Sequence, residues 1–367
     1  LFDNLGGATV LHACQPDQIR HVRGTVNVGW WFWETDRISP EFDWMERLES
    51  LDVLFVPSQW QAGWVARLGL RTPLHVLPWP HALAARAPHP AQRSDDVIRV
   101  CRPFSRAQLV ELDRVESAAH HDAVARSEMI AAQSARRRPA DLPPESYLFA
   151  VQTDAPRKGL ACLLSEWRAY RRAGGKIATL LIRFSGLNVA QDAGRLLRSL
   201  SQIGLAATGG DSEGLEGVQA ILEPVRAKTL HDLYAGAAAL VAPSFGEGFG
   251  GTLVEAVQAG TLPVGPRHTA CGELLPTDYP LSYESQAFIG ALKGQLPIQP
   301  ANGTWHPPRP GAIAAALHRL DAMDGDDRAA VRRQLESHMR ALLAPDAVAA
   351  RFAAAIDGRR TRRDLAA

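Results

Sequence analysis

Short apolar runs alternate with amphipathic segments along most of this chain of 367 residues. The apolar runs are predicted to be buried strands, at residues 9–13, 26–33, 53–56, 74–77, 147–152, 178–184, 219–222, 239–242 and 262–264. The intervening segments have helical periodicity, at residues 41–50, 59–68, 160–173, 191–200, 229–237 and 252–259. This alternation predicts an α/β fold with doubly wound parallel sheets, in which ligands bind at the carboxyl ends of the strands.

The length of the chain predicts more than one domain, because a single hydrophobic core stops growing beyond about 250–300 residues. We assign residues 1–141 and 142–344 to two Rossmann-like domains, and residues 345–367 to a C-terminal helix. The polar segment 107–144 is rich in alanine and arginine, which favours one or two helices, and Pro143-Pro144 is the candidate hinge. Two domains of this kind suit an enzyme whose ligands bind in the cleft between them.

Charge and cysteine content exclude several classes of protein. The chain has 40 basic and 39 acidic residues and a formal net charge of +1, which argues against a nucleic-acid partner. The four cysteines are widely spaced and contain no Cys-x-x-Cys pair, so neither a zinc site nor a disulfide framework is indicated, and a cytoplasmic location is expected. No apolar stretch is long enough for a transmembrane helix, which leaves at most peripheral association with a membrane.

A glycine-rich turn between the predicted strand 239–242 and the predicted helix 252–259 is the strongest candidate for a ligand site. Glycines at the start of a helix leave backbone N–H groups free to bind an anion such as a diphosphate. The candidate donors of the turn are Gly248, Phe249, Gly250, Gly251 and Thr252. Glu247 and Glu255 flank the turn, and their carboxylates are predicted to accept hydrogen bonds from hydroxyl groups. The alternative is an ordinary turn with two solvated glutamates.

A basic loop follows the predicted strand 147–152 and supplies the positive charge that the turn lacks. It contains Arg157 and Lys158, and such cations can neutralise the charge that develops on a departing diphosphate. Gln152 at the end of the strand donates hydrogen bonds but carries no charge. The alternative is that both cations lie on the solvated surface.

Together the two segments resemble the nucleotide-sugar site of the retaining glycosyltransferases of GT-B fold, often called family four. The resemblance is carried by Pro-Ser-x-x-Glu-Gly-Phe-Gly-x-x-x-x-Glu-Ala, which begins at Pro243, and by Asp-x-Pro-Arg-Lys-Gly, which begins at Asp154. It implies that Glu247 holds sugar hydroxyls, Glu255 the ribose, and Lys158 the diphosphate with Arg157. It also implies phosphate contacts from Gly250, Gly251 and Thr252, and a base that rests near Val225. The sequence departs from the pattern at Gln152, where many relatives carry an arginine.

The first half of the chain resembles the same family more loosely. A tryptophan-glutamate pair ends at Glu34, and an Asp-x-x-x-x-Pro-Ser strand end begins at Asp52. Glu34 is predicted either to reach the transferred sugar or the acceptor, or to form a surface ion pair with Arg37. The aromatic residues at 30, 31 and 33 either stack on a sugar or pack in the core. His12 is the best match for the histidine that relatives place near the sugar, and the short segment before it predicts a truncated N-terminal domain.

The resemblance implies transfer of a sugar from a nucleoside-diphosphate sugar to a saccharide or lipid-linked acceptor hydroxyl, with retention of anomeric configuration. It implies no metal and no further cofactor, and the setting typical of such relatives is bacterial polysaccharide or glycoconjugate synthesis at the inner face of the membrane. Residues 1–141 would then form the acceptor side, residues 142–344 would bind the nucleotide sugar, and residues 345–367 would pack back on the first domain. One alternative is a non-catalytic, nucleotide-binding scaffold, and a weaker one is a nucleotide-sugar epimerase. The acidic segment at Asp324 is predicted to be a helix N-cap rather than a metal site.

Overall fold

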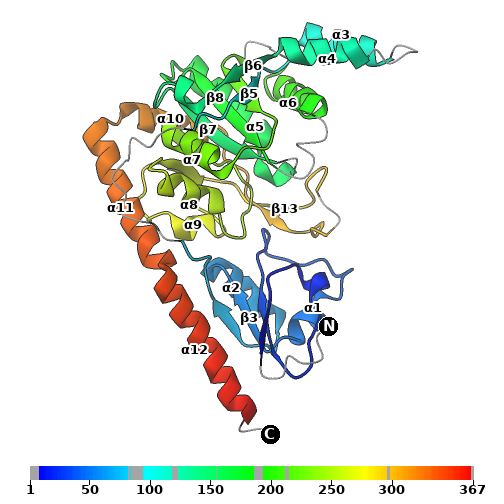
Figure 1. Cartoon of the computed structure of the whole chain (residues 1–367), viewed down its shortest axis with the longest axis vertical. Coiled ribbons are helices and arrows are strands. Elements are labelled where there is room, and N and C mark those ends of the chain that lie inside the picture. The colour runs from blue at the N-terminus through cyan, green and yellow to red at the C-terminus, as the bar shows by residue number, and fades with distance from the viewer. Residues whose placement is uncertain are drawn as a thin grey trace.

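The computed structural model describes residues 8–81, 83, 94–117, 123–153, 155–185, 193–210, 215–295 and 298–364. These form two large sheets, joined by a long helical tail, and a third sheet of two strands (Figure 1). Asp154 of the basic loop lies outside the described residues.

The first sheet has four parallel strands in chain order, β1 (Thr9–His12), β2 (Val26–Trp30), β3 (Val53–Val56) and β4 (Leu74–Val76). Its connections include the helices α1 (Trp44–Glu49) and α2 (Gln59–Val65). Every residue of β3 is buried, because alternate side chains pack on opposite faces. Leu54 and Val56 pack in one core cluster with residues of α1 and α2, whereas Val53 and Phe55 pack in another with residues of the helical tail.

The second sheet has eight strands in the order β12-β11-β10-β7-β8-β9-β5-β6. The strands that alternate with helices are β7 (Tyr147–Gln152), β8 (Thr179–Phe184), β9 (Val218–Ile221), β10 (Ala239–Val241), β11 (Pro263–Pro266) and β12 (Ser282–Tyr283). The helices among them are α5 (Leu160–Arg172), α6 (Ala193–Ala207), α7 (Ala227–Gly236), α8 (Gly251–Gln258) and α9 (Cys271–Leu274). These strands run parallel, and chain order reverses direction between β7 and β10. This is the order of a doubly wound sheet, as predicted, and in such sheets ligands usually bind at the reversal of chain order.

Residues 98–137 differ from the prediction, which placed everything before residue 142 with the first domain. Strand β5 (Ile98–Cys101) pairs antiparallel with β9, and β6 (Ser134–Arg137) pairs antiparallel with β5, so both belong to the second sheet. Between them lie the helices α3 (Arg106–Ser117) and α4 (Ala123–Ala132), which confirm the predicted helical segment. The two strands are short, and most of β6 is exposed, so no apolar run marked them in the sequence.

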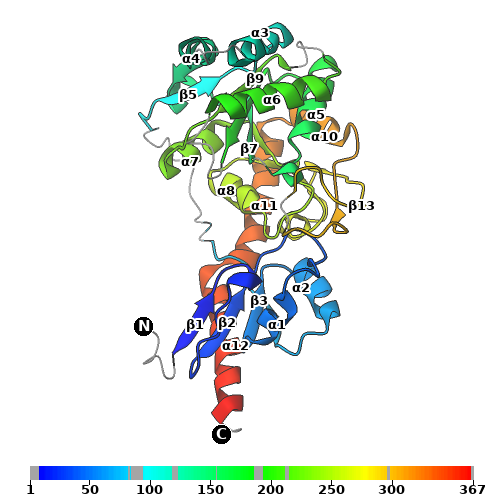
Figure 2. The same ribbon diagram turned by 90° about the vertical axis from the view of Figure 1, so that its right-hand side faces the viewer.

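The C-terminal region contains the hairpin of β13 (Phe288–Ile289) and β14 (Thr304–Trp305), followed by α10 (Ala312–Ala322), α11 (Gly325–Leu343) and α12 (Pro345–Asp364). Asp324 caps α11 in a reciprocal capping box with Asp327, which confirms the N-cap prediction. Helix α12 extends along the first sheet (Figure 2). There Phe352 stacks on Phe55 with ring centroids 5.4 Å apart, so the tail covers a face of that sheet.

Among the described residues, no helix combines the length and the apolar character needed to cross a bilayer. Cys14, Cys101, Cys162 and Cys271 are free thiols.

Candidate functional site

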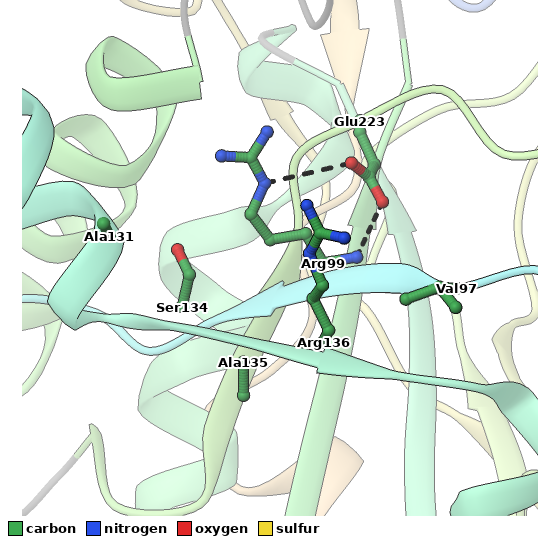
Figure 3. A pocket seen from close by; sticks show the side chains of 7 residues that line it. All are labelled: Val97, Arg99, Ala131, Ser134, Ala135, Arg136 and Glu223. Atoms are coloured by element: carbon green, nitrogen blue, oxygen red, sulfur yellow. Dashed lines mark hydrogen bonds and ion pairs between the residues drawn. The ribbon is translucent and has the colours of Figure 1, made fainter.

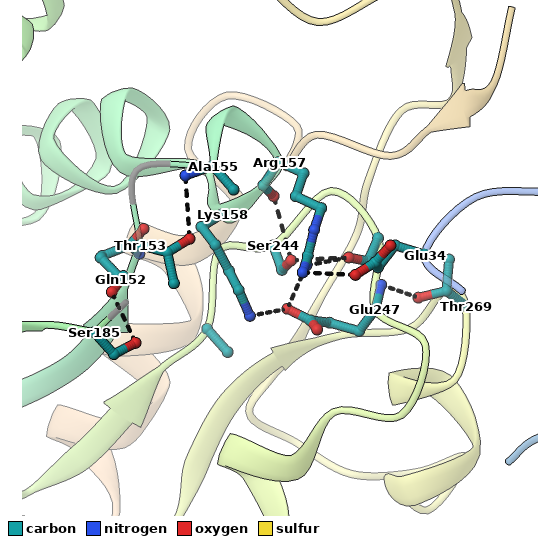
Figure 4. Close-up of polar contacts among 12 residues, drawn as sticks. Glu34, Gln152, Thr153, Ala155, Arg157, Lys158, Ser185, Ser244, Glu247 and Thr269 are labelled. Atoms are coloured by element: carbon teal, nitrogen blue, oxygen red, sulfur yellow. Dashed lines mark hydrogen bonds and ion pairs between the residues drawn. The ribbon is translucent and has the colours of Figure 1, made fainter. Parts of the chain in front are cut away.

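The candidate site lies where the chain order of the second sheet reverses. The loop after β7 carries Arg157 and Lys158, and the loop after β10 carries Glu247 (Figure 4). The structure therefore brings together, from segments 89 residues apart, the two motifs that the sequence singled out. The carboxyl ends of neighbouring parallel strands at such a reversal form the usual ligand crevice of this architecture.

The two loops are held together by their backbones. Arg157 and Lys158 end a 3-10 helix, Pro156–Lys158, which is followed by Gly159 at φ +69°. A side chain at Gly159 would place its Cβ 2.3 Å from the carbonyl oxygen of Pro243, so only glycine permits this approach. The backbone N–H of Phe245 donates to the Arg157 carbonyl at 2.7 Å. These contacts fix the direction in which both cations point.

Four charged side chains form an ion cluster: Glu34, Arg157, Lys158 and Glu247. Lys158 Nζ lies 2.5 Å from Glu247 Oε1, and Arg157 Nη1 lies 3.4 Å from the same oxygen. Arg157 Nη2 lies 2.8 Å from Glu34 Oε1. The cluster carries two positive and two negative charges, and none of its side chains is more than 22% exposed. The prediction that left Arg157 as a possible surface residue is therefore replaced by a largely buried, doubly paired cation.

The charges in the cluster determine the protonation of Glu247. Burial alone would raise the pKa of its carboxyl group, but Lys158 and Arg157 lower that pKa from 4.5 to about 2. Burial would likewise lower the pKa of Arg157, and Glu247 and Glu34 raise it above its ordinary value. Near neutral pH Glu247 is therefore ionised, so it can accept hydrogen bonds but cannot donate a proton.

Glu34 reaches the cluster because the loop after β2 lies directly against the glycine-rich turn. A Cβ on Gly246 would lie 2.2 Å from the Glu34 carbonyl oxygen, and one on Gly248 would lie 2.8 Å from the Trp33 backbone nitrogen. Of the two predictions for Glu34, an ion pair with Arg37 is not what the structure contains, since Glu34 pairs with Arg157 instead. This is a contact between the first and second sheets' loops that no local pattern could reveal.

Glu255 occupies a separate position, on the exposed side of α8. Its Oε2 accepts a hydrogen bond from Tyr234 Oη at 2.8 Å. Burial, followed by the Glu255 charge, raises the pKa of Tyr234 well above its usual range, so the phenol remains a donor. This contact orients the whole carboxylate of Glu255. An oriented carboxylate is suited to accept hydrogen bonds from a diol.

The glycine-rich turn forms the predicted strand-to-helix connection. Gly250 is the N-cap of α8 at φ +92°, and no side chain caps that helix end. Thr252 follows in the first turn of the helix. The ring of Phe249 lies between Phe32 and His81, with centroid distances of 6.4 and 6.0 Å. Phe249 thus contributes packing between the two parts of the chain in addition to its backbone N–H.

Three further predicted residues lie outside the ion cluster. Gln152 is completely buried at the end of β7, and neither atom of its side-chain amide has a hydrogen-bond partner among the described residues. Val225 follows β9 and is partly buried against the core. His12 at the end of β1 lies 3.2 Å, Nε2 to Oδ1, from Asn27. No contact joins His12 to the cluster within the described part of the chain.

The aromatic residues after β2 pack in the core rather than line a sugar site. Trp31 and Trp33 are each 2% exposed and contact Trp44 edge-on, at centroid distances of 5.6 and 4.8 Å. Trp30 is 9% exposed and stacks on Trp79. Core packing, one of the two predictions made for this cluster, is therefore what the structure contains.

Sequence reasoning missed a group of residues that follow β11 and β14. Thr269 Oγ1 accepts a hydrogen bond from the Glu247 backbone N–H at 3.2 Å, and His268 Nδ1 lies 3.4 Å from the same hydroxyl. The rings of His268 and His306 stack with centroids 4.7 Å apart. Burial, and then the proximity of His306, lower the pKa of His268 to about 3. The position of His268 and Thr269 just beyond the predicted strand 262–264 was the available signal, because the ends of parallel strands share one edge.

The buried imidazole of His268 leads to a prediction about pH. In the unfolded chain His268 gains a proton below its ordinary pKa of 6.5, whereas in the native protein it stays neutral down to about 3. Its contribution to the free energy of unfolding is therefore present above pH 6.5 and declines by about 1.4 kcal/mol per pH unit below it. Urea unfolding at pH 7.5, 6.5 and 5.5 should show a steeper decline for the parent protein than for His268→Gln. His75→Gln, which removes an exposed imidazole on β4, is the control and should retain the parent slope. Equal slopes for the parent and His268→Gln would contradict the prediction.

Known structures share the fold of this chain. A UDP-forming α,α-trehalose-phosphate synthase from Burkholderia xenovorans, in complex with glucose-6-phosphate, matches with a TM-score of 0.56 at 13% identity, over 92% of this chain and 69% of that one. Sucrose-phosphate synthase from Thermosynechococcus elongatus matches with a TM-score of 0.55 at 16% identity, over 95% and 70%. TarM of S. aureus, in complex with UDP among other ligands, matches with a TM-score of 0.51 at 9% identity, over 91% of this chain, which spans about half (51%) of TarM.

By sequence, no protein-family model and no curated protein matches the chain. The structural likenesses show the fold, which is an α/β fold of the GT-B type with parallel sheets.

Proposed function

We propose that this chain transfers a sugar from a nucleoside-diphosphate sugar to an acceptor hydroxyl, with retention of anomeric configuration. The observation that carries the proposal is the meeting of Lys158, Arg157 and Glu247 at the chain reversal of a GT-B sheet. The resemblance assigns these residues to the donor, and their convergence supports that assignment.

Lys158 is the residue that we assign to the leaving diphosphate. Among the described residues it has one carboxylate partner, Glu247, so an incoming phosphate can share its remaining N–H donors. The N-terminus of α8 offers uncapped backbone N–H groups, from Gly251 and Thr252, for the same anion. These donors stabilise the charge that develops as the sugar departs, and the proposal requires no metal ion or other cofactor.

Glu247 is assigned to the sugar hydroxyls. Because its pKa is about 2, it stays ionised and accepts hydrogen bonds throughout the physiological range. Two cations share its charge, which makes it a poor nucleophile, and a double displacement through a glycosyl-enzyme would need a nucleophile at the anomeric carbon. We therefore favour attack on the same face as the leaving group, assisted by its phosphate.

The remaining roles follow the resemblance and the contacts. Glu255, oriented by Tyr234, would bind the ribose, and the base would lie near Val225. Glu34 would orient the guanidinium group of Arg157 at the boundary with the acceptor side. The proposed acceptor is a saccharide or a lipid-linked saccharide, in bacterial polysaccharide or glycoconjugate synthesis, with the protein in the cytoplasm or at the inner face of the membrane.

The alternative is a nucleotide-binding or scaffold protein without catalysis. Two observations favour it: Gln152 stands where many relatives carry an arginine, and Arg157 is already paired with two carboxylates. Hydrolysis of the donor in the absence of acceptor distinguishes the two, because a scaffold has no such activity to lose when Glu247 is replaced.

Calorimetric titration with UDP, GDP, dTDP and ADP tests the donor site. We expect one nucleotide to bind selectively, and UDP is the first choice because UDP is bound by TarM and formed by the trehalose-phosphate synthase. Glu255→Ala should weaken that binding about 10- to 100-fold, since a charge-assisted hydrogen bond contributes about 1.5–3 kcal/mol. Glu284→Ala removes an exposed carboxylate, 74% accessible, and is the matched control. If none of the four nucleotides bound, the scaffold alternative would become the favoured function.

A further inference from the structure

Two arginines face each other at the far edge of the second sheet. Arg99 on β5 and Arg136 on β6 are register partners in the antiparallel pair, so their side chains leave the same face of the sheet side by side. Both line a pocket of about 510 Å³ that α4, β5 and β6 form with Glu223 (Figure 3). Neither strand was predicted from the sequence, so no function was predicted for this pocket.

The pocket is lined by two arginines and one carboxylate, that of Glu223, so its lining has an excess of positive charge. Glu223 Oε1 accepts a hydrogen bond from the Arg99 backbone N–H at 2.6 Å, and its Oε2 lies 3.9 Å from Arg99 Nε. Arg136 has no ion-pair partner among the described residues, and its side chain is exposed. Like charges directly opposite each other in a β ladder are destabilising, and a bound anion between them would offset that cost.

The chemistry of the lining favours a phosphoryl group. Guanidinium groups present planar forks of N–H donors that match the oxygens of phosphate. The Ser134 hydroxyl is already committed, since it donates to the Ile130 carbonyl at 2.9 Å, so recognition rests on the two arginines. A concave pocket of this size suits the phosphoryl group of a small metabolite rather than an extended surface.

We propose that this arginine pocket binds the phosphoryl group of a small phosphorylated metabolite, as a second site distinct from the donor site. Strand β6 lies four positions from β7 in the sheet, so the axes of these two strands are ~19 Å apart at about 4.8 Å per strand. At that distance one phosphorylated sugar does not span both sites. The pocket would therefore be occupied independently of the donor.

Titration with inorganic phosphate at constant ionic strength tests the proposal. The Lys158→Ala variant serves as the parent, because it removes the phosphate contact proposed for the donor site. We expect saturable binding that becomes at least about tenfold weaker in Arg99→Gln/Arg136→Gln, the loss expected for charge-assisted hydrogen bonds. Arg333→Gln, which removes an exposed arginine on α11, is the control and should bind as its parent does.

Three outcomes would overturn the proposal. They are the absence of saturable phosphate binding, equal affinity in the double variant and its parent, and preferential binding to phosphatidylglycerol vesicles that requires both arginines. The last would assign the pocket to a lipid headgroup. Both arginines are exposed, so their replacement by glutamine leaves the core intact. The outcome is also independent of the proposed function, because the nucleotide titration can succeed or fail without it.

Discussion

Replacement of Lys158 with alanine should lower the rate of sugar transfer about 10²–10³-fold, the cost of removing one preorganised group that stabilises developing charge. Within the part of the chain that the structure describes, Lys158 Nζ has a single carboxylate partner, so it is the cation that a departing diphosphate can recruit. Arg157 has two carboxylate partners and a backbone contact to Gly246, and it is therefore more firmly held. We expect Lys158→Ala to lower kcat more than it raises KM for the donor.

The measurement is steady-state transfer, or donor hydrolysis where the acceptor is not known, with the nucleotide sugar that the titration identifies. Lys293→Ala removes an exposed lysine and is the matched control. Lys158→Arg should restore part of the rate, because it returns a positive charge with different geometry. A Lys158→Ala enzyme with the parent kcat would show that Lys158 does not stabilise the leaving group.

Replacement of Trp31 with alanine should lower the free energy of unfolding by about 3–5 kcal/mol, the usual cost of deleting a buried tryptophan side chain. Trp31 is 2% exposed and contacts Trp44 and Trp64 edge-on, each at 5.6 Å between centroids. Its Nε1 donates to Gln15 at 3.1 Å, so the polar atom of the ring is also satisfied. Truncation would leave a cavity between β2, α1 and α2 that these rigid rings cannot fill.

Chemical denaturation compares Trp31→Ala with Trp79→Ala. Trp79 is 44% exposed, so its removal should cost clearly less than that of Trp31. Nucleotide binding should be retained in folded Trp31→Ala, since the residue does not contact the ion cluster. The core assignment is wrong if Trp31→Ala leaves stability unchanged and instead weakens the binding of a sugar.

Much of the second sheet follows from the sequence. The bounds predicted for β7, residues 147–152, are those of the structure, and α8 begins one residue before its predicted start. These elements are buried apolar runs or regular amphipathic segments, whose periodicity is a local property. The two short strands β5 and β6 have no such run, and they were missed together with the sheet to which they belong.

In the candidate site, too, local patterns were predicted from the sequence and contacts between distant segments were not. The glycine-rich turn and the Arg157-Lys158 loop were found because each is a contiguous pattern after a strand. The partners of Glu34 and Glu255, by contrast, are Arg157 and Tyr234, and nothing local distinguishes Arg157 from Arg37 as a partner. Gln152 illustrates a further limit, since its full burial, with no hydrogen-bond partner for its side chain among the described residues, depends on the packing around it.

The sequence by itself therefore determined the class of fold, the alternation of its elements and the loops that carry the ligand motifs. Periodicity and turn chemistry act over a few residues, so a single chain segment suffices to express them. Only the tertiary structure decided that Glu34 meets Arg157, that His268 lies behind Glu247, and that Arg99 faces Arg136. Those contacts depend on strand order and register, which are set by packing between segments far apart in the chain.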